Sequence, residues 1–369
     1  MELYLGLMSG TSLDAIDAAL VDFAGAQPRL LAHHSSPIEP GLRQELLALC
    51  QPGSHELDRL GRLDGIMARR FAATALELLA LAGIGPGRVH AIGSHGQTVR
   101  HAPAAPEPYT VQIGNPSLIA ELTGILTVAD FRRRDLAAGG QGAPLAPGFH
   151  NAFFRRTGET RVVVNIGGIA NISILPGDAA QPVSGFDTGP GNTLLDIWAE
   201  RHLGTPLDRD GTWGGSGQVI PKLLAVLLAD PYFTLPAPKS TGREHFHLDW
   251  LAAQLAIWGG AIEPRDVQAT LAALTVESIA ASVRVAASDC RRLLVCGGGV
   301  HNRQLMTGLT AALPGVVVES TAAHGIDPDF LEAMGFAWLA RETLAGRPGN
   351  LPEVTGARGP RVLGGIYPA

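Results

Sequence analysis

The stretch at residues 185–192, GFDTGPGN, places a carboxylate, Asp187, among glycines and a proline. A carboxylate can act as a general base, and glycines let backbone N–H groups approach a ligand closely. Asn192 and Thr193 can cap the apolar helical run that follows at residues 194–198. Asp and Gly are also common in turns, so this stretch alone is consistent with an Asp that only closes a turn. We take Asp187 as the candidate base because other motifs of the chain support that role.

A turn near the N-terminus, at residues 9–12, contains three hydroxyl side chains and a glycine. Apolar residues alternate with other residues at positions 3–7 before it and 16–20 after it, which predicts a strand, a tight turn and a second strand. Such a turn can cradle a phosphate, and Asp14 or Asp17 can hold a magnesium ion through water. An ordinary hairpin explains this stretch equally well.

The segment at residues 161–175, RVVVNIGGIANISIL, repeats this arrangement. An apolar strand leads to a turn that contains Gly167 and Gly168, and a second strand follows. Two copies of one hairpin, one in each half of the chain, predict an internally duplicated fold. A pair of such turns can grip a phosphate chain from both sides, and Asp187 follows soon after the second one.

A triple glycine, Gly297 to Gly299, follows the buried strand predicted at residues 292–296. Glycines at this place let the backbone lie against a flat or charged ligand such as an adenine nucleotide. A dinucleotide-binding fingerprint would have its third glycine where Asn302 stands, which makes a nicotinamide enzyme a weak alternative.

The string KSTGR, from Lys239 to Arg243, is not a Walker A motif, because the required glycine-rich segment does not precede the lysine.

Candidate substrate contacts follow a strand predicted at residues 89–93. His95 and Gln97 come directly after it, and the carboxyl ends of strands are where open α/β sheets bind ligands. A single histidine also serves as a capping or turn residue, so a structural role stays open.

Arg132, Arg133 and Arg134 form the densest basic run of the chain. An arginine in this run can bind a carboxylate or phosphate, and a solvated charge run is the simpler explanation for two of the three.

The remaining pattern supplies the elements that position these residues. Apolar spacing predicts helices at residues 41–50, 55–81, 115–122, 264–287 and 327–344, and strands at residues 109–113 and 125–128. Glu332 falls in the first turns of the last long helix. We expect the glycine- and proline-rich tail after residue 346 to pack back on the first domain.

Composition narrows the class of protein. A chain of 369 residues predicts two domains, and 46% hydrophobic with 17% charged residues is typical of a folded α/β protein. A net charge of -6 gives no support to nucleic-acid binding. The three cysteines are too scattered for a disulfide framework or a zinc site. No apolar run reaches the ~18 residues of a membrane span, and no secretory signal is recognisable, so we expect a cytoplasmic protein.

The ordered motifs, taken together, resemble those of the anhydro-N-acetylmuramic acid kinases. The resemblance covers the chain from Gly6 to Pro368 and is carried by the segments GLMSGTSLDAID, IGSHGQTVRH, ADFRRRDLAAGGQGAPL, VNIGGIANIS, GFDTGPGN, PKSTGRE, VCGGGVHN, EAMGFAWLA and GGIYP. It implies the fold of actin, heat-shock chaperones and sugar kinases: two ribonuclease-H-like α/β lobes with an ATP cleft between them. We place the first lobe at residues 1–130 with about 346–369, and the second, with the catalytic Asp and the adenosine motif, at 131–345. Ala15 stands where the family usually has glycine.

The resemblance also implies roles for individual residues. Asp187 is the implied catalytic carboxylate and Glu332 its helper, while Arg134 is the implied partner of the lactyl carboxylate. We keep His95 and Gln97 as further substrate contacts, and we predict Asp14 and Asp187 as the magnesium ligands. The implied nucleotide contacts are Gly10, Thr11, Ser12, Leu13, Asp14, Ala15, Ile16, Asp17, Gly167, Gly168, Gly297, Gly298, Gly299 and Asn302.

The expected reaction is ATP-dependent, hydrolytic opening of a 1,6-anhydro amino sugar with phosphorylation of O6, in cell-wall recycling. The expected ligands are ATP, Mg²⁺ and the sugar, with neither a nucleic acid nor a membrane as partner, and the resemblance implies a homodimer. Two other classes stay open. A conventional sugar kinase would use the same Asp on a free hydroxyl, and an ATP-driven switch of the actin or chaperone kind would share the lobes but need a polymer interface or a peptide-binding domain.

Overall fold

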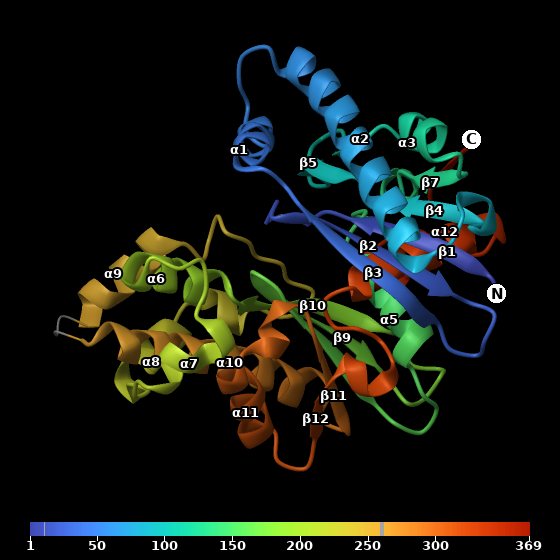
Figure 1. Cartoon of the computed structure of the whole chain (residues 1–369). Coiled ribbons are helices and arrows are strands. Elements are labelled where there is room, and N and C mark those ends of the chain that lie inside the picture. Colours follow the sequence, from blue (N-terminus) through green and yellow to red (C-terminus); the bar gives the residue numbers. More distant parts are fainter. Residues whose placement is uncertain (11, 259–261) are drawn as a thin grey trace. The chain divides into compact units, whose positions relative to one another are not determined.

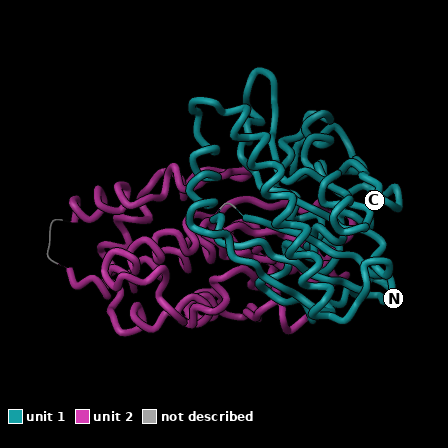
Figure 2. Tube along the Cα trace, turned by 45° about the horizontal axis from the view of Figure 1, so that its top comes forward, with its two compact units in different colours: residues 1–153, 325–369 teal, residues 154–324 magenta. Residues whose placement is uncertain are grey.

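The computed structural model describes residues 1–10, 12–258 and 262–369. The chain forms two compact units, of which the first comprises residues 1–153 and 325–369 and the second residues 154–324 (Figure 2). Both are α/β units (Figure 1), as the sequence predicts. The expected lobe boundaries at residues 130 and 346 differ from this division, because the segments at 131–153 and 325–345 pack with the first unit.

The first unit is built on a sheet with the strand order β13-β7-β4-β1-β2-β3. The strands β1 to β3 form an antiparallel meander, and β4 and β7 continue the sheet parallel to β1. The C-terminal β13 pairs antiparallel with β7, so the tail packs on the first unit as expected. The bounds of this unit's elements are β1 (Leu3–Met8), β2 (Ala15–Asp22), β3 (Arg29–Pro37), α1 (Pro40–Leu49), α2 (Glu56–Ala82), η1 (Pro86–Arg88), β4 (Ala91–Ser94), β5 (Gln97–Ala102), β6 (Tyr109–Ile113), α3 (Pro116–Thr123), β7 (Thr127–Ala129), α4 (Arg133–Ala137), α5 (Ala146–Phe154), α12 (Leu331–Leu344), α13 (Pro352–Thr355) and β13 (Gly365–Tyr367).

The second unit repeats this topology with the strand order β10-β9-β8-β11-β12. Its strands β8 to β10 form the antiparallel meander, and β11 and β12 run parallel to β8. The duplication expected from the two hairpins is therefore present in the strand order itself. The bounds are β8 (Arg161–Ile166), β9 (Ile169–Leu175), β10 (Ser184–Pro190), α6 (Thr193–Leu203), η2 (Arg209–Gly211), α7 (Thr212–Gly215), α8 (Pro221–Leu228), η3 (Pro231–Thr234), α9 (Leu248–Trp258), α10 (Pro264–Ala286), β11 (Arg292–Cys296), η4 (Gly298–His301), α11 (Arg303–Ala312), β12 (Val317–Ser320) and η5 (Thr321–His324).

Helices cover both faces of the first sheet. Side chains of successive strand residues point to opposite faces, so Leu5 and Leu7 of β1 pack with α2 residues such as Phe71, while Gly6 faces α12. A Cβ on Gly6 would overlap the carbonyl oxygen of Ala333, and one on Gly93 of β4 would overlap that of Phe336. Glycine at these two positions therefore lets α12 lie directly on the sheet.

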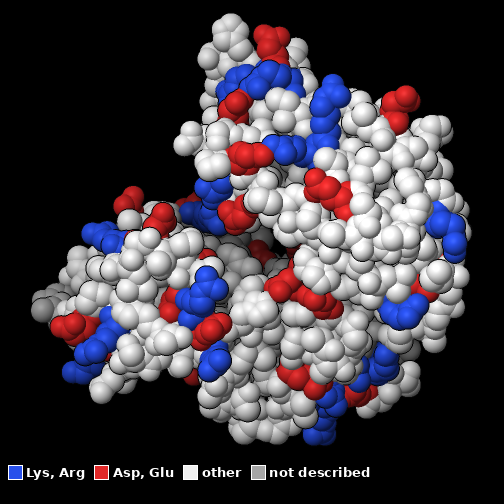
Figure 3. All heavy atoms as spheres, viewed as in Figure 1, with Lys and Arg blue, Asp and Glu red and all other residues white. Residues whose placement is uncertain are grey.

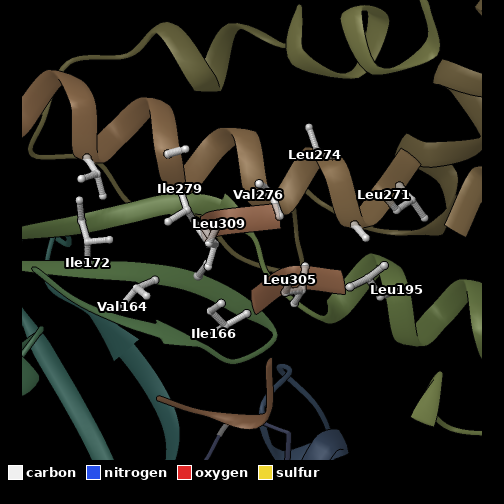
Figure 4. Close-up of a cluster of buried hydrophobic side chains, with 14 of the residues drawn as sticks. Val164, Ile166, Ile172, Leu195, Leu271, Leu274, Val276, Ile279, Leu305 and Leu309 are labelled. Atoms are coloured by element: carbon white, nitrogen blue, oxygen red, sulfur yellow. The ribbon is translucent and has the colours of Figure 1, made fainter. Parts of the chain in front are cut away.

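The core of the second unit lies between its sheet and α10. Figure 4 shows Val164, Ile166 and Ile172 of the strands facing the apolar side chains of α10, with Leu305 and Leu309 of α11 beside them. Among the described residues, α10 alone has the length and composition of a membrane span, and 61% of that window is buried inside the protein, as in the core helix of a folded unit.

Candidate active site

Asp187 lies on β10, the edge strand of the second sheet, beside a β-bulge between residues 187 and 189. The glycines and Pro190 around it are unusual inside a strand. The bulge accommodates them, since bulges re-aim side chains and often lie next to active sites. The backbone of Asp187 is fixed on both sides: its N–H donates to the carbonyl of Lys239 (3.1 Å), and its carbonyl accepts from the Tyr232 hydroxyl (2.6 Å).

The side chain of Asp187 is poised to accept a proton. Its Oδ2 accepts a hydrogen bond from the backbone N–H of Thr241 (3.1 Å), and no other described residue donates to the carboxylate. Burial raises the pKa of Asp187 to about 6; the Thr241 N–H lowers this pKa, and the charge of Glu244 raises it further. A carboxylate with a pKa near the working pH is suited to general-base catalysis.

The turn at Gly167 and Gly168 is attached to the N-terminus of α6. The carbonyl of Gly167 accepts from the N–H of Asn192 (2.8 Å), and that of Gly168 accepts from the N–H groups of Gly191 (2.9 Å) and Thr193 (3.0 Å). A trans peptide points its N–H opposite to its carbonyl, so the N–H of Gly168 faces away from α6. The turn thus presents a backbone donor, as a phosphate site requires.

The triple glycine packs against the end of β8. Gly297 has a φ of 76°, and a Cβ there would overlap the Asn165 side chain, while one on Gly299 would overlap Ile166. Asn302 caps α11, because its Oδ1 accepts from the N–H of Gln304 (2.9 Å). We did not predict this capping role, although Asn directly before a helix is the usual sequence signal for a cap.

The turn between β1 and β2 of the first unit is held in its conformation by side chains. Leu13 is buried with a positive φ of 56°, which is rare for a residue other than glycine. Arg43 of α1 donates to the carbonyl of Ser12 through Nε (3.2 Å) and Nη2 (3.1 Å), and it pairs with Asp14 at 3.5 Å. Sequence reasoning did not find Arg43, which lies far along the chain. Thr11 lies outside the described residues.

Other expected members of this turn have clear positions. Ala15 and Ile16 begin β2, and Ala15 is not among the described non-glycine residues with positive φ, so its methyl group causes no backbone strain. A Cβ on Gly10 would meet only the Ser12 side chain, at 3.9 Å. Asp17 accepts from the Ser35 hydroxyl (2.7 Å), and burial raises the pKa of its carboxyl.

Gln97 and His95 lie beside this turn. The Oε1 of Gln97 accepts from the hydroxyl of Ser9 (2.7 Å), so Gln97 is connected to the turn itself. The Nε2 of His95 accepts from Nε (3.2 Å) and Nη2 (2.9 Å) of Arg132. Burial and the charge of Arg132 lower the pKa of His95 to about 3, so the ring is neutral. Since arginine only donates, the proton of His95 is on Nδ1.

Arg132, the first residue of the basic run, is half-buried and the least exposed of the three arginines. Its Nη1 donates to the carbonyl of Gly142 (2.9 Å), and burial lowers its pKa to about 10 while the charge of Glu332 raises it. Arg133 and Arg134 are exposed, and Arg133 pairs with Asp130 at 3.0 Å. The expectation that two of the three arginines are solvated agrees with this arrangement.

Glu332 lies on the first turn of α12, one residue before the helix contacts Gly6. Burial raises the pKa of its carboxyl, the charge of Arg132 lowers it, and the charge of Asp17 raises it. Glu332, Arg132 and Asp17 therefore belong to one electrostatic group within the first unit.

The loop after the basic run is fixed by Asp135, which sequence reasoning did not single out. This fully buried carboxylate accepts from the N–H of Gly142 (2.8 Å), the amide of Asn350 (2.7 Å) and the hydroxyl of Thr355 (2.8 Å). A Cβ on Gly140 would overlap it. Through Gly142, Asp135 also positions the carbonyl that Arg132 contacts.

The candidate magnesium ligands lie in different units, Asp14 in the first and Asp187 in the second. Among the described residues, no group of three or more His, Cys, Asp or Glu side chains could hold a metal ion. Mg²⁺ is usually bound by one or two carboxylates together with water and substrate phosphates. Each of these carboxylates is a ligand type that suits Mg²⁺.

Surface charge of both signs is intermixed on the face shown in Figure 3. On α1 and α2, for example, Arg62 pairs with Glu45 and Arg70 with Glu39.

Comparison with known proteins gives one consistent result. The family described as anhydro-N-acetylmuramic acid kinase matches residues 2–369. A protein of that name from Xanthomonas campestris is 57% identical over 371 residues, covering 100% of this chain and 97% of the relative. Another, from Cupriavidus pinatubonensis, is 54% identical over 368 residues, covering 99% of this chain and 98% of the relative.

Solved structures are more distant. The activator of 2-hydroxyisocaproyl-CoA dehydratase from Clostridium difficile, with bound ADPNP, has a TM-score of 0.48 at 12% identity, covering 93% of this chain and 97% of its own. A ROK family glucokinase from Streptomyces griseus, in complex with glucose and AMPPNP, has a TM-score of 0.42 at 15% identity, covering 92% and 99%.

Proposed function

This chain belongs to the anhydro-N-acetylmuramic acid kinase family, and we propose that it uses ATP to open 1,6-anhydro-N-acetylmuramic acid and to phosphorylate its O6. The products are N-acetylmuramic acid 6-phosphate and ADP, and the reaction belongs to cell-wall recycling. The enzyme is a kinase, and it works in the cytoplasm as a homodimer.

The anhydro bond determines what the base must do. O6 is tied to C1 in this substrate, so the sugar has no free 6-hydroxyl to deprotonate. Asp187 instead takes a proton from water, whose oxygen forms a bond to C1 while the C1–O6 bond breaks. O6 then forms a bond to the γ-phosphorus, and the bond between that phosphorus and ADP breaks. Positioning and charge stabilisation supply most of the catalysis.

The hydrogen bonds of Asp187 support this role. The Thr241 N–H fixes Oδ2, which leaves Oδ1 to face the attacking water. Glu332 assists from the first unit as a second carboxyl that can carry a proton, and burial raises its pKa.

The nucleotide contacts come from glycine-rich turns. Backbone donors of residues 10–17 and of the turn at Gly167 and Gly168 bind the phosphates, and Gly297 to Gly299 with Asn302 flank the adenosine. Asp14 and Asp187 hold the Mg²⁺ of the nucleotide, which neutralises phosphate charge when bound.

Side chains of the first unit bind the sugar. Arg134 pairs with the lactyl carboxylate, and its exposure leaves the guanidinium accessible to a ligand. His95 and Gln97 are further substrate contacts. The neutral His95, protonated on Nδ1, can offer a donor to a sugar oxygen.

The raised pKa of Asp187, on a fixed strand, is the observation that carries this proposal. Turnover in ¹⁸O-labelled water tests it. We expect label on the anomeric oxygen and none in the phosphoryl group, provided that mass analysis precedes exchange of the free reducing sugar. Label on phosphorus, or an anhydro sugar that is not consumed, would contradict the mechanism. A conventional sugar kinase would phosphorylate N-acetylmuramic acid and leave the anhydro sugar unchanged.

A further inference from the structure

Two polar groups beside the turn at Gly167 and Gly168 have no part in the mechanism given above. The first is the hydroxyl of Thr193, at the start of α6. Thr193 is only 3% exposed, and its Oγ1 has no hydrogen-bond partner among the described residues. A buried polar group without a partner costs about 1–3 kcal/mol, so such groups in folded proteins usually have a function or an unseen partner.

The second group is the guanidinium of Arg243. The residue is exposed, and no carboxylate or carbonyl among the described residues pairs with it. Arginine binds phosphate through a planar fork of N–H donors. A free arginine on a surface is ordinary in itself, so its position decides whether it has a function.

Both groups converge on Gly168. A Cβ on this glycine would lie 2.7 Å from Thr193 Oγ1, 3.7 Å from Arg243 Nη2 and 3.9 Å from Arg243 Nε. Glycine therefore lets the buried hydroxyl lie directly against the turn, with the guanidinium beside it. The hydroxyl and the guanidinium both donate hydrogen bonds, so Gly168 has a donor side chain from α6 and another from the loop that carries Arg243.

The segment that carries Arg243 also fixes the base. Two residues before Arg243, the N–H of Thr241 donates to Asp187 Oδ2, and the carbonyl of Lys239 accepts from the N–H of Asp187. Lys239 is anchored in turn, because its Nζ donates to the carbonyls of Tyr232 (3.1 Å) and Phe233 (3.3 Å). Arg243 is thus placed by the same short loop that orients the carboxylate.

We propose that Arg243 and Thr193 bind the phosphoryl group of the nucleotide at Gly168, and that Arg243 stabilises the charge on this group while it is transferred. The inference rests on the proposed kinase reaction. Arg243 neither gives nor takes a proton; it supplies positive charge and N–H donors to the phosphoryl oxygens. Arginines that act in this way contribute about 10³–10⁵-fold to turnover in other phosphoryl-transfer enzymes.

The test compares Arg243→Ala and Arg243→Lys with Arg201→Ala, which removes another exposed arginine of the same unit, from the last turn of α6. We expect Arg243→Ala to lower kcat by about 10²-fold or more, with the KM of the sugar unchanged. Arg243→Lys should recover only part of this loss, because lysine lacks the planar fork. Arg201→Ala should stay within about twofold of the wild type.

Chemical rescue separates a charge effect from a structural one. Methylguanidinium, added well below denaturing concentrations, should restore part of the kcat of Arg243→Ala and leave that of Asp187→Asn unchanged. ADP with aluminium fluoride, which imitates the phosphoryl group in transfer, should bind Arg243→Ala more weakly than wild type, while ADP alone binds both equally. A kcat of Arg243→Ala equal to that of Arg201→Ala would overturn the proposal, and so would equal binding of the aluminium fluoride complex.

Variants of Thr193 give a second, independent test of the proposed site. Thr193→Val removes the hydroxyl at nearly constant volume and should lower kcat by about tenfold, while Thr193→Ser, which keeps the hydroxyl, should restore it. Equal kcat values for the two variants would remove Thr193 from the site. The test of Arg243 does not depend on which sugar receives the phosphoryl group. If wild type phosphorylates a different sugar, the proposed function fails, but the same variants assayed with that sugar still test Arg243.

Discussion

The two hairpin turns occupy equivalent places in the two sheets, yet they are fixed by different means. The first runs from Ser9 to Asp14 and depends on side chains: Arg43 contacts its backbone, Leu13 takes a positive φ, and Gln97 binds Ser9. The second consists of Gly167 and Gly168, and the backbone N–H groups at the start of α6 fix it directly.

This difference shows how the same strand topology supports a different kind of site in each unit. Around the first turn, buried side chains form a polar group with His95, Arg132 and Glu332, which suits recognition of a sugar with many oxygens. Around the second turn, glycine and backbone donors lie close to Asp187, which suits phosphate binding and proton transfer. We therefore expect changes at the sugar contacts of the first unit to act mainly on substrate binding and changes around Asp187 in the second unit to act mainly on turnover.

The largest expected effect comes from the base. Asp187→Asn should lower kcat by about 10²–10⁴-fold with ATP binding preserved, because the amide is nearly isosteric but cannot accept a proton. Steady-state kinetics with a nucleotide titration measure both quantities, and Glu332→Gln, from the first unit, is the comparison. Near-normal turnover of a folded Asp187→Asn would make Glu332 the first candidate base. Proton transfer would then belong to the first unit and not to the second.

Arg134 tests the other half of the comparison. Arg134→Ala should raise the KM of the anhydro sugar about 10- to 100-fold and leave the KM of ATP unchanged, since a charge-assisted pair is worth about 1.5–3 kcal/mol. Arg133→Ala is the matched control, because Arg133 is a neighbouring exposed arginine paired with Asp130. Equal losses for both substrates, or no loss, would remove Arg134 from the sugar site.

The turns themselves can be compared by adding one methyl group to each. Gly168→Ala would place a Cβ 2.7 Å from Thr193 Oγ1, whereas Gly10→Ala would meet nothing closer than 3.9 Å. We expect Gly168→Ala to cost about 1–3 kcal/mol of unfolding free energy and to weaken ATP binding, and Gly10→Ala to stay within about 0.5 kcal/mol of wild type. Denaturant unfolding measures the free energies. Equal costs would mean that the two turns are packed alike.

Much of this arrangement was predictable from sequence because it depends on local patterns. Alternating apolar residues around Gly167 and Gly168 predicted the second hairpin, and the apolar strand at Arg292–Cys296 was predicted with its correct bounds. Strand β3, of nine residues, and the shorter β5 and β12 were missed. The helix expected from residue 327 begins only at Leu331, since the side chain of Asp327 accepts from the N–H of Asp329 and stabilises a turn there.

Long-range partners could not be predicted. Nothing in the sequence around Asp135 points to Asn350 or Thr355, more than two hundred residues later. The basic run predicted an anion-binding arginine, for which the resemblance implied Arg134, and nothing in the sequence pointed to the contact of Arg132 with His95, because only the fold brings these two residues together. Likewise, Asp187 lies inside a strand rich in glycine, where a bulge overrides the local preference for a turn.

The last expected effect concerns the stability of the second unit and its dependence on pH. Burial raises the folded-state pKa of Asp187 to about 6, above its ordinary value of 3.8, so the folded protein binds a proton more tightly than the unfolded chain does. The stability that this carboxyl contributes is complete below about pH 4 and is lost as the pH rises through about 6. Asp187→Asn removes the buried charge and should stabilise the ligand-free protein at pH 8 by up to about 3 kcal/mol, with no difference at pH 4. Chemical unfolding at both pH values measures this, with EDTA present so that no metal pairs with Asp187. A variant that is less stable than wild type at pH 8 would show that the carboxylate is well solvated or paired, and that it is not poised as a base.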